Sequence, residues 1–563
     1  MKKVEAPGPA TPPARPNAWQ HRLRSDFATA ILHWVIVALF LVSLATGLRI
    51  ASDALDASWT SAIAAILPQG DVYVLHIWSA WALMAACGAY VLFLIAARLV
   101  PRVALDASRI RALGSHDRRT RWQSINVLIY WLAFALVAIA TGTGSLMYFN
   151  LLTDTQALVT TLHRIAAWTL LAYVLLHVLA QWAMAGWRGL LKILTPRLAY
   201  AAAALVALGG AGALAAGVFA LDRMTLESLV IAEAAEPPRL DGEVADAAWQ
   251  EAVPVTVETH KGANLPDGTI PVRVRGVHDG ESAYLLFEWP DATRSQKHLP
   301  LEKTAAGWRV LQTAFDKADE NTFYEDKFAV MLSRESRLAA LRTSHLGARP
   351  LDGLPGAKGE RGLHYTTDGS IVDVWHWKSV RVGPLGQIDD NYFGPPRRAP
   401  DNPGARYTGG YTQDPKTGGG FTMNWEAFDT GIVQPRWLPR SPEVLAERLG
   451  AVSLDPETGD EGLWWLPRSL MVPATPEADA QFPVGTVMPS VIVEEPFQGD
   501  RGDVAAVARW QDGWWRMEVR RKLAATSDYD VTIGKDTYLW VSVFDHTQTR
   551  HSFHLRPLRI DLR

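Results

Sequence analysis

Cysteine is almost absent from this chain of 563 residues, which contains Cys87 alone. A single cysteine excludes an intrachain disulfide, a zinc or iron–sulfur site made of cysteines, and a C-x-x-C-H haem attachment. The formal net charge is also small, at −3. No basic surface for nucleic acid is therefore expected, and any cofactor must be held without thiolates.

Long apolar runs are missing from the second part of the chain, because every one of them lies before about residue 221. The residues that follow mix Trp, Gly, Pro and charged side chains as water-soluble domains do. The hydrolytic motifs G-x-S-x-G and H-E-x-x-H are missing too, as is a Gly-rich phosphate loop. The sequence therefore predicts a membrane part followed by a soluble domain without a hydrolytic centre.

Five segments are long and apolar enough to cross the ~30 Å of hydrocarbon in a bilayer. They cover residues 27–48, 73–97, 124–148, 162–185 and 198–221. The fifth is rich in Ala and Gly and contains no ionisable side chain, which is typical of a tether or of a close-packing helix.

Basic residues indicate the orientation in the membrane. The loop 98–122 holds seven arginines, whereas the loop 149–161 holds no Lys or Arg. The tail 1–24 is Pro-rich and basic and lacks a signal-peptide cleavage pattern. Because basic loops stay inside, we expect a multi-pass protein of the bacterial inner membrane with a cytoplasmic N terminus and a periplasmic C-terminal domain.

Four histidines lie within the apolar segments: His33 in the first, His76 in the second, and His163 and His177 in the fourth. A spacing of 14 residues gives about 21 Å of rise and lies within about 40° of a whole number of turns, so the last two rings leave one helix face. Depth pairs His33 with His177 near the cytoplasmic side. It pairs His76 with His163 near the outer side. Two facing imidazoles make a six-coordinate haem b site, which transfers electrons.

The ILHW start of the first apolar segment, the TG at its end and the H-x13-H pattern of the fourth resemble the bacterial di-haem cytochrome b561 family. The resemblance covers about residues 20–195. It implies a four-helix core with two b haems that exchanges electrons with quinone. Gly47, Gly142 and Gly144 fit a close approach of a flat macrocycle to the backbone.

From about Pro237 the sequence turns to short alternating stretches separated by turn residues, which is typical of strands. Seven of them are predicted as strands: VPVTVETH, IPVRVRGVHD, SAYLLFEWPD, DKFAVMLS, IVDVWHW, GWWRMEVRRKL and TYLWVSVFD. The predicted architecture is a transmembrane four-helix haem bundle over 25–197 and a fifth, tethering helix over 198–221. A linker over 222–237 leads to an all-β sandwich over 238–563.

The stretches LDGEVADAAW, HDGESAYLLFEWPDATRS, YEDKFAVMLS and DVWHWKS and the terminal TRHSFHLRPLRIDL resemble the haem-binding domain of ethylbenzene dehydrogenase-type proteins. That domain is the γ subunit found beside periplasmic molybdenum enzymes related to dimethyl sulfoxide reductase. The resemblance implies a β-sandwich that holds one non-covalent b haem.

Relatives of this type use a Met and a Lys as axial ligands of the haem iron. The resemblance places the Met at Met331, and His551 stands at the Lys position, a departure that would make this third haem Met/His-ligated. His260 is a rival ligand, and His376 or Lys378 is a more distant one.

These expectations describe a membrane electron conduit with three b haems. It would connect the quinone pool with a periplasmic partner such as a cytochrome c or a molybdenum oxidoreductase. Two other functions stay open: a membrane-anchored ligand-binding or docking module on a di-haem cytochrome, and an oxidoreductase acting on superoxide or quinone. Sequence does not fix the direction of electron flow, because the midpoint potentials depend on ligands and burial.

Overall fold

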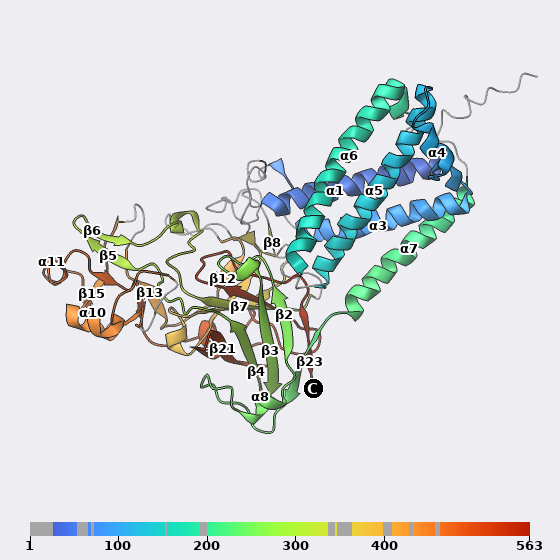
Figure 1. Cartoon of the computed structure of the whole chain (residues 1–563). Coiled ribbons are helices and arrows are strands. Elements are labelled where there is room, and N and C mark those ends of the chain that lie inside the picture. Colours follow the sequence, from blue (N-terminus) through green and yellow to red (C-terminus); the bar gives the residue numbers. More distant parts are fainter. Residues whose placement is uncertain are drawn as a thin grey trace, which may run out of the picture. The chain divides into compact units, whose positions relative to one another are not determined.

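A computed structural model of the chain describes most of its residues (Figure 1). The described residues are 26–52, 63, 66–68, 72–151, 155–191, 200–335, 344–345, 363–366, 368–397, 408–426, 432–456 and 462–563. The chain divides into two compact units. The helical unit contains Met1–Leu44, Ile77–Met147 and Leu158–Leu221, and the β unit contains Ala45–His76, Tyr148–Ala157 and Asp222–Arg563. The predicted tail 1–24 lies outside the described residues.

All five predicted apolar segments are helices that are long and apolar enough to cross a membrane. They are α1 (Phe27–Ser52), α3 (Val72–Ala96), α5 (Arg118–Tyr148), α6 (Gln156–Leu191) and α7 (Ala201–Met224). Helix α6 is interrupted at Gly186, whose φ of 54° is left-handed and favours glycine. A short helix, α4 (Ala107–Ala112), lies in the Arg-rich loop, where the Asp106 carboxylate accepts a hydrogen bond from the Arg109 N–H.

The fifth helix packs closely within the helical unit. A Cβ added at Gly210 of α7 would lie 2.2 Å from Leu92 of α3, and one added at Gly88 of α3 would lie 3.6 Å from Leu214 of α7. Glycine lets two helix backbones approach where a larger side chain would collide. The Ala- and Gly-rich composition of α7 therefore serves close packing against α3.

The β unit is built on one curled 12-stranded sheet (Figure 1). Its strand order is β12-β11-β10-β7-β22-β23-β1-β3-β4-β21-β20, with β2 paired to β3. The strands are β1 (Ser228–Glu233), β2 (Val255–Thr259), β3 (Ile270–His278), β4 (Ser282–Pro290), β7 (Lys327–Ser333), β10 (Val372–Lys378), β11 (Asp389–Phe393), β12 (Tyr411–Gln413), β20 (Ala505–Gln511), β21 (Trp514–Lys522), β22 (Tyr538–Phe544) and β23 (Leu558–Leu562). All seven predicted strands are present, and an all-helical part is followed by a mostly-β domain as expected.

The core of this sheet is rich in aromatic side chains. Trp289 of β4, Phe328 of β7, Trp377 of β10 and Trp515 of β21 are at most 3% exposed and belong to one apolar cluster. Trp289 stacks on Phe328 with ring centroids 4.5 Å apart. Because alternate residues of a strand face opposite sides, this core occupies one face of β7 and β10 and leaves the other for different side chains.

Residues 222–237, which the sequence analysis treats as a linker, contain strand β1. β1 pairs in parallel with β23 on one side and with β3 on the other. Leu229 and Ile231 are 0% exposed. The β domain therefore begins at about Ser228, and only residues 225–227 separate α7 from the sheet.

A second apolar cluster lies in the long insertions of the β unit. It is built from β5 (Leu301–Thr304), β6 (Gly307–Val310), β14 (Ile432–Val433), β15 (Trp437–Pro439), α10 (Pro442–Leu449), β16 (Leu466–Pro467), β17 (Met471–Pro473) and β18 (Val487–Met488). The remaining strands are β8 (Ser344–His345), β9 (Leu363–His364), β13 (Phe421–Met423) and β19 (Val491–Val493), and the remaining short helices are α8 (Ala247–Glu251) and α11 (Pro476–Asp479). These insertions carry strands and a core of their own.

Candidate functional site

The four membrane histidines come from three helices and are all half-buried. His33 lies in α1, His76 in α3, and His163 and His177 in α6. His33 and His177 both belong to the helical unit and lie close enough for their charges to interact. This is the pair expected near the cytoplasmic side. His76 belongs to the β unit, and its pairing with His163 stays a prediction.

A Thr-Gly pair at the end of α1 holds the His76 ring. The Thr46 hydroxyl lies 3.2 Å from His76 Nδ1. A Cβ added at Gly47 would lie 3.0 Å from Cε1 of the same ring, which is closer than ordinary van der Waals contact. Glycine therefore makes room for the imidazole, and threonine fixes its rotation.

A second Thr-Gly pair, in α5, holds the His163 ring in the same way. The Thr143 hydroxyl lies 3.2 Å from His163 Nδ1, and the Ala140 carbonyl oxygen lies 2.9 Å from it. A Cβ added at Gly144 would lie 3.3 Å from His163 Cε1, whereas one added at Gly142 would meet nothing within 4 Å. Gly47 and Gly144 thus make room for the histidine rings, and Gly142 has no such role.

Contacts through Nδ1 are those that orient a histidine for binding metal through Nε2. In both Thr-Gly pairs the partner oxygens lie at Nδ1, so each ring is held in an orientation suited to an axial ligand. The donor set and the glycine that accommodates each ring fit the bis-His b haem expected from the sequence.

The His177 ring lies among aromatic side chains. Its centroid is 5.7 Å from that of Tyr173, which stacks on it, and 6.0 Å from that of Tyr130. Nδ1 of His177 is buried and has no hydrogen-bond partner among the described residues. Such an unpaired buried polar atom is costly in a protein interior and is typical of a position that a ligand or a water completes.

Met331 lies in β7, where burial alternates as the sequence predicts. Phe328, Val330 and Leu332 are at most 1% exposed and face the core, whereas Ala329 and Met331 are half-buried on the opposite face. Residues directly opposite in an antiparallel pair point to the same side.

The register of β10 against β7 places His376 on the same face of the sheet as Met331. In the pairing of β10 with β7, His376 is opposite Ala329 and Val374 is opposite Met331. His376 is therefore on the Met331 face of the sheet.

Three histidines gather on this side of the sheet and are here called the imidazole cluster: His364, His376 and His551. The Phe544 ring lies close to two of them, with its centroid 5.2 Å from that of His376 and 4.8 Å from that of His551. His376 Nδ1 is 3.1 Å from the Tyr411 hydroxyl, and its Nε2 is buried without a hydrogen-bond partner among the described residues. His551 Nδ1 lies 3.0 Å from the Ser552 carbonyl oxygen.

The imidazole cluster is held in its neutral form. Burial, followed by the neighbouring His551, lowers the pKa of His364 to about 4. Burial, followed by the charge of Lys378, lowers the pKa of His376 well below its usual value, and burial lowers the pKa of His551. Neutral imidazole is the form that binds metal, so all three rings are in the protonation state that iron binding requires at neutral pH.

Two other proposed ligands already have polar partners. His260 Nε2 lies 2.9 Å from the Asn150 side-chain oxygen, and its Nδ1 lies 3.2 Å from the Thr269 hydroxyl. The Lys378 ammonium is paired with the Asp389 carboxylate. The structure does not bring His260 or Lys378 into the imidazole cluster as unpaired donors.

Sequence reasoning treated His376 as a distant alternative and missed His364. A partial signal exists for His376, because in the strand VDVWHWK the histidine alternates with Trp375 and Trp377 and must face away from the core. No local signal exists for His364, since its neighbours in the cluster come from distant segments.

Comparisons with known proteins give two family matches. Residues 246–556 match the family model described as ethylbenzene dehydrogenase, and residues 24–196 match the one described as prokaryotic cytochrome b561. No curated protein sequence matches the chain.

Similar solved structures include a carbohydrate binding module of family 9 from Caldicellulosiruptor kristjanssonii in complex with cellotriose. It is 8% identical, covers 60% of this chain and 94% of its own, and has a TM-score of 0.21. A putative carbohydrate-binding protein from Bacteroides uniformis is 7% identical, covers 60% of this chain and all (100%) of its own, and has a TM-score of 0.25. Similarity at this level assigns no ligand to this chain.

Proposed function

We propose that this chain carries electrons between quinone and a periplasmic redox partner. Two findings support the proposal: the chain belongs to the ethylbenzene dehydrogenase family through residues 246–556, and it is a membrane b-type cytochrome for electron transfer through residues 24–196. Bound b haem supplies one-electron redox chemistry in such proteins. The partner is a cytochrome c or a molybdenum oxidoreductase. The setting is the bacterial inner membrane, with residues 238–563 in the periplasm.

The repeated Thr-Gly pair is the observation that carries the membrane part of this proposal. Two imidazoles, on different helices, are each contacted at Nδ1 by a threonine hydroxyl and accommodated at Cε1 by the glycine that follows. A histidine with a purely structural role needs no such repeated arrangement. We therefore assign His76 and His163 to one haem and His33 and His177 to the other.

The imidazole cluster supports a third haem in the exported domain. Neutral rings of His376 and His551 both lie close to Phe544, on the sheet face that also carries Met331. We assign His551 and Met331 as the axial ligands, with His376 as the alternative imidazole because its Nε2 has no described partner. His260 is no longer favoured, since both of its ring nitrogens have polar partners.

A row of aromatic rings within the β unit supports transfer between the outer membrane site and this third site. Tyr73 lies three residues before His76 on α3, so both side chains leave the same helix face. The Tyr73 ring lies 6.2 Å from that of Phe553, which lies 6.3 Å from that of His551. These residues all belong to the β unit. They form a short packed route from a ligand of one site to a ligand of the next.

Haem counting by the pyridine-haemochrome assay tests this function on the full-length protein purified with haem available. We expect about three b haems per chain in the wild type and about two in His551→Ala. His260→Ala is the matched control and should keep about three, because its ring is held by hydrogen bonds alone.

Two haems in the wild type, together with an unchanged count in His551→Ala, would contradict the third site. The exported domain would then be a docking or ligand-binding module on a di-haem cytochrome. A loss in His376→Ala combined with no loss in His551→Ala would move the ligand assignment to His376.

A further inference from the structure

A second constellation of the β unit lies apart from the histidines. Five aspartates, here called the five-aspartate cluster, come from separate segments of the chain: Asp373 of β10, Asp390 of β11, Asp414 after β12, Asp503 before β20, and Asp530 before β22. Carboxylate oxygens of Asp373, Asp390 and Asp530 lie within 4.8 Å of one another. These elements converge although up to 157 residues separate them, from Asp373 to Asp530.

The cluster is deeply buried and carries a large excess of negative charge. Asp373 and Asp390 are 0% exposed and Asp414 is 3% exposed. Among the described residues, Arg521 is the base paired with the cluster, at 3.1 Å from Asp373 and 3.0 Å from Asp530. If all five carboxyl groups were ionised, one guanidinium would leave four negative charges uncompensated. Buried charge of this kind is very costly unless it is paired, protonated or bound to a metal.

Several carboxylate oxygens of the cluster have no hydrogen-bond donor among the described residues. They are Oδ1 of Asp373, Oδ2 of Asp390, both oxygens of Asp414 and Oδ1 of Asp503. Asp390 and Asp503 lie within hydrogen-bonding range of each other, although two carboxylates offer only acceptors. Burial and mutual repulsion raise the pKa of Asp390 well above its usual value and that of Asp414 to about 8. Something positive is required between these oxygens.

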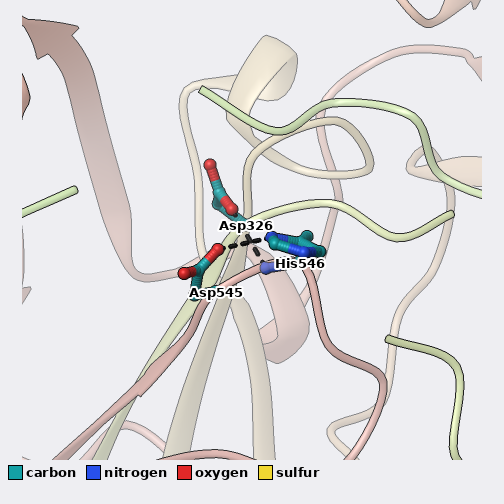
Figure 2. Close-up of side chains that lie close together, drawn as sticks. All are labelled: Asp326, Asp545 and His546. Atoms are coloured by element: carbon teal, nitrogen blue, oxygen red, sulfur yellow. Dashed lines mark hydrogen bonds and ion pairs between the residues drawn. The ribbon is translucent and has the colours of Figure 1, made fainter. Parts of the chain in front are cut away.

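Another acidic group in the β unit is better supplied with hydrogen-bond donors. Figure 2 shows Asp326, Asp545 and His546 together. Asp326 accepts hydrogen bonds from the backbone N–H groups of Ser295, at 2.7 Å, and His546, at 3.1 Å. Asp545 Oδ1 lies 2.5 Å from His546 Nδ1. Among the described residues, five buried carboxylate oxygens of the five-aspartate cluster have no hydrogen-bond partner, whereas no buried oxygen of Asp326 or Asp545 is left without one.

We propose that the five-aspartate cluster binds one calcium ion. A set of hard carboxylate oxygens without nitrogen or sulfur donors suits calcium, which takes six to eight oxygen ligands. The ion would tie β10 and β11 to the segments that follow β12 and precede β20 and β22. Its role is structural and separate from the proposed electron transfer.

The test uses the full-length protein in detergent, stripped with EDTA and then titrated with Ca²⁺, with Tb³⁺ luminescence as a second probe. Trp375, which lies next to Asp390 in the sheet register, and the nearby Tyr529 can sensitise Tb³⁺. We expect about one Ca²⁺ per chain and a rise of roughly 5 °C in the thermal midpoint of the β domain at saturating Ca²⁺.

Substitutions locate the ion. Asp390→Asn and Asp414→Asn should weaken Ca²⁺ binding at least about tenfold, because each removes a charged ligand. Asp528→Asn is the matched control, since it changes the same charge on an exposed residue of the segment before β22, and should bind Ca²⁺ like the wild type. If Asp390→Asn does not fold, Asp414→Asn and the wild-type titration still decide the question.

Protons are the other means of neutralising the cluster, and they predict the reverse. Asparagine would then mimic a protonated acid, so Asp390→Asn would raise the thermal midpoint in EDTA, and Ca²⁺ would leave the wild-type midpoint unchanged. Either result would overturn the proposal. So would Tb³⁺ binding that is lost in Asp326→Asn but kept in Asp390→Asn and Asp414→Asn.

Discussion

The helices and the β domain place their histidines by different means. In the membrane helices two of the four rings, His76 and His163, are each held by a neighbouring helix through a Thr-Gly pair, as Thr46 and Gly47 hold His76. In the β domain the rings of the imidazole cluster come from β9, β10 and the segment after β22, and those of His376 and His551 pack against Phe544. The first arrangement is local and repeated, and the second is assembled from distant segments.

This difference shows how a binding site can be encoded. A helix repeats every 3.6 residues, so a spacing in sequence becomes a spacing in space, and two ligands on α6 can be read directly from the chain. A sheet brings together residues whose separation in sequence carries no information. A ligand set in the β domain therefore has to be found in the structure.

The largest expected effect is the loss of a whole haem from the helices. Each single alanine variant of the four membrane histidines should lose one b haem, because an axial position is left empty. The double variant His76→Ala/His163→Ala should lose no more than either single variant, whereas His76→Ala/His177→Ala should lose two. The pyridine-haemochrome assay measures the count, and His116→Ala, in an exposed loop, is the control.

If both double variants lost the same number of haems, the pairing of the histidines by depth would be wrong. The comparison between a local and an assembled arrangement would then no longer hold for the membrane half.

The next largest effect concerns the β domain, whose stability should depend on pH. Burial, with a smaller effect of the neighbouring His260, lowers the pKa of His554 to about 4. The Nε2 atom of His554 accepts a hydrogen bond from Val541 N–H, and its Nδ1 faces the Arg556 carbonyl oxygen. The unfolded chain, with an ordinary histidine pKa, binds the proton more readily. The contribution of His554 to the free energy of unfolding is therefore fully present above about pH 6.5, and roughly 3 kcal/mol of it is lost as the pH drops toward 4.

Thermal midpoints of the full-length protein between pH 7.5 and 4.5 measure this loss. His554→Gln keeps one acceptor and one donor without titrating, so its profile should be flatter than that of the wild type. An identical slope in both proteins would show that His554 does not contribute.

The smallest effect concerns the glycines that face the rings. Gly47→Ala should weaken haem retention roughly tenfold, since the new methyl group would press on the His76 ring and overpacking costs about 1–3 kcal/mol. Gly142→Ala is the matched control because an added Cβ there meets nothing within 4 Å. Haem loss to apomyoglobin, followed spectroscopically, compares the two, and equal rates would show that the Gly47 contact is unimportant.

Much of the fold could be predicted from local patterns. Apolar runs gave all five long helices, and alternation gave seven strands and the two faces of β7. β1 was missed because its six residues, SLVIAE, follow directly on the apolar α7 and owe their strand conformation to pairing with β3 and β23. β11 and β12 were missed because they lie in a segment rich in Gly and Pro.

The candidate sites divide along the same line. The membrane histidines could be named from sequence because helix spacing selects them. The five-aspartate cluster could not, because its members are spread over 157 residues (373 to 530) and become neighbours only when the sheet curls. Acidic residues are common in loops, and nothing in their local sequence marks these five.

Strand β1 has a consequence for how the β domain folds. It is the first strand of the sheet in chain order, and it pairs with β23, the last. The two halves of the sheet cannot join until residues 558–562 have arrived beside a strand that emerged more than 300 residues earlier, so this pairing is a late event of very high contact order. Until then the edge of β1 that pairs with β23 is open to strands of other chains, which makes this the step of folding at which a chaperone would act.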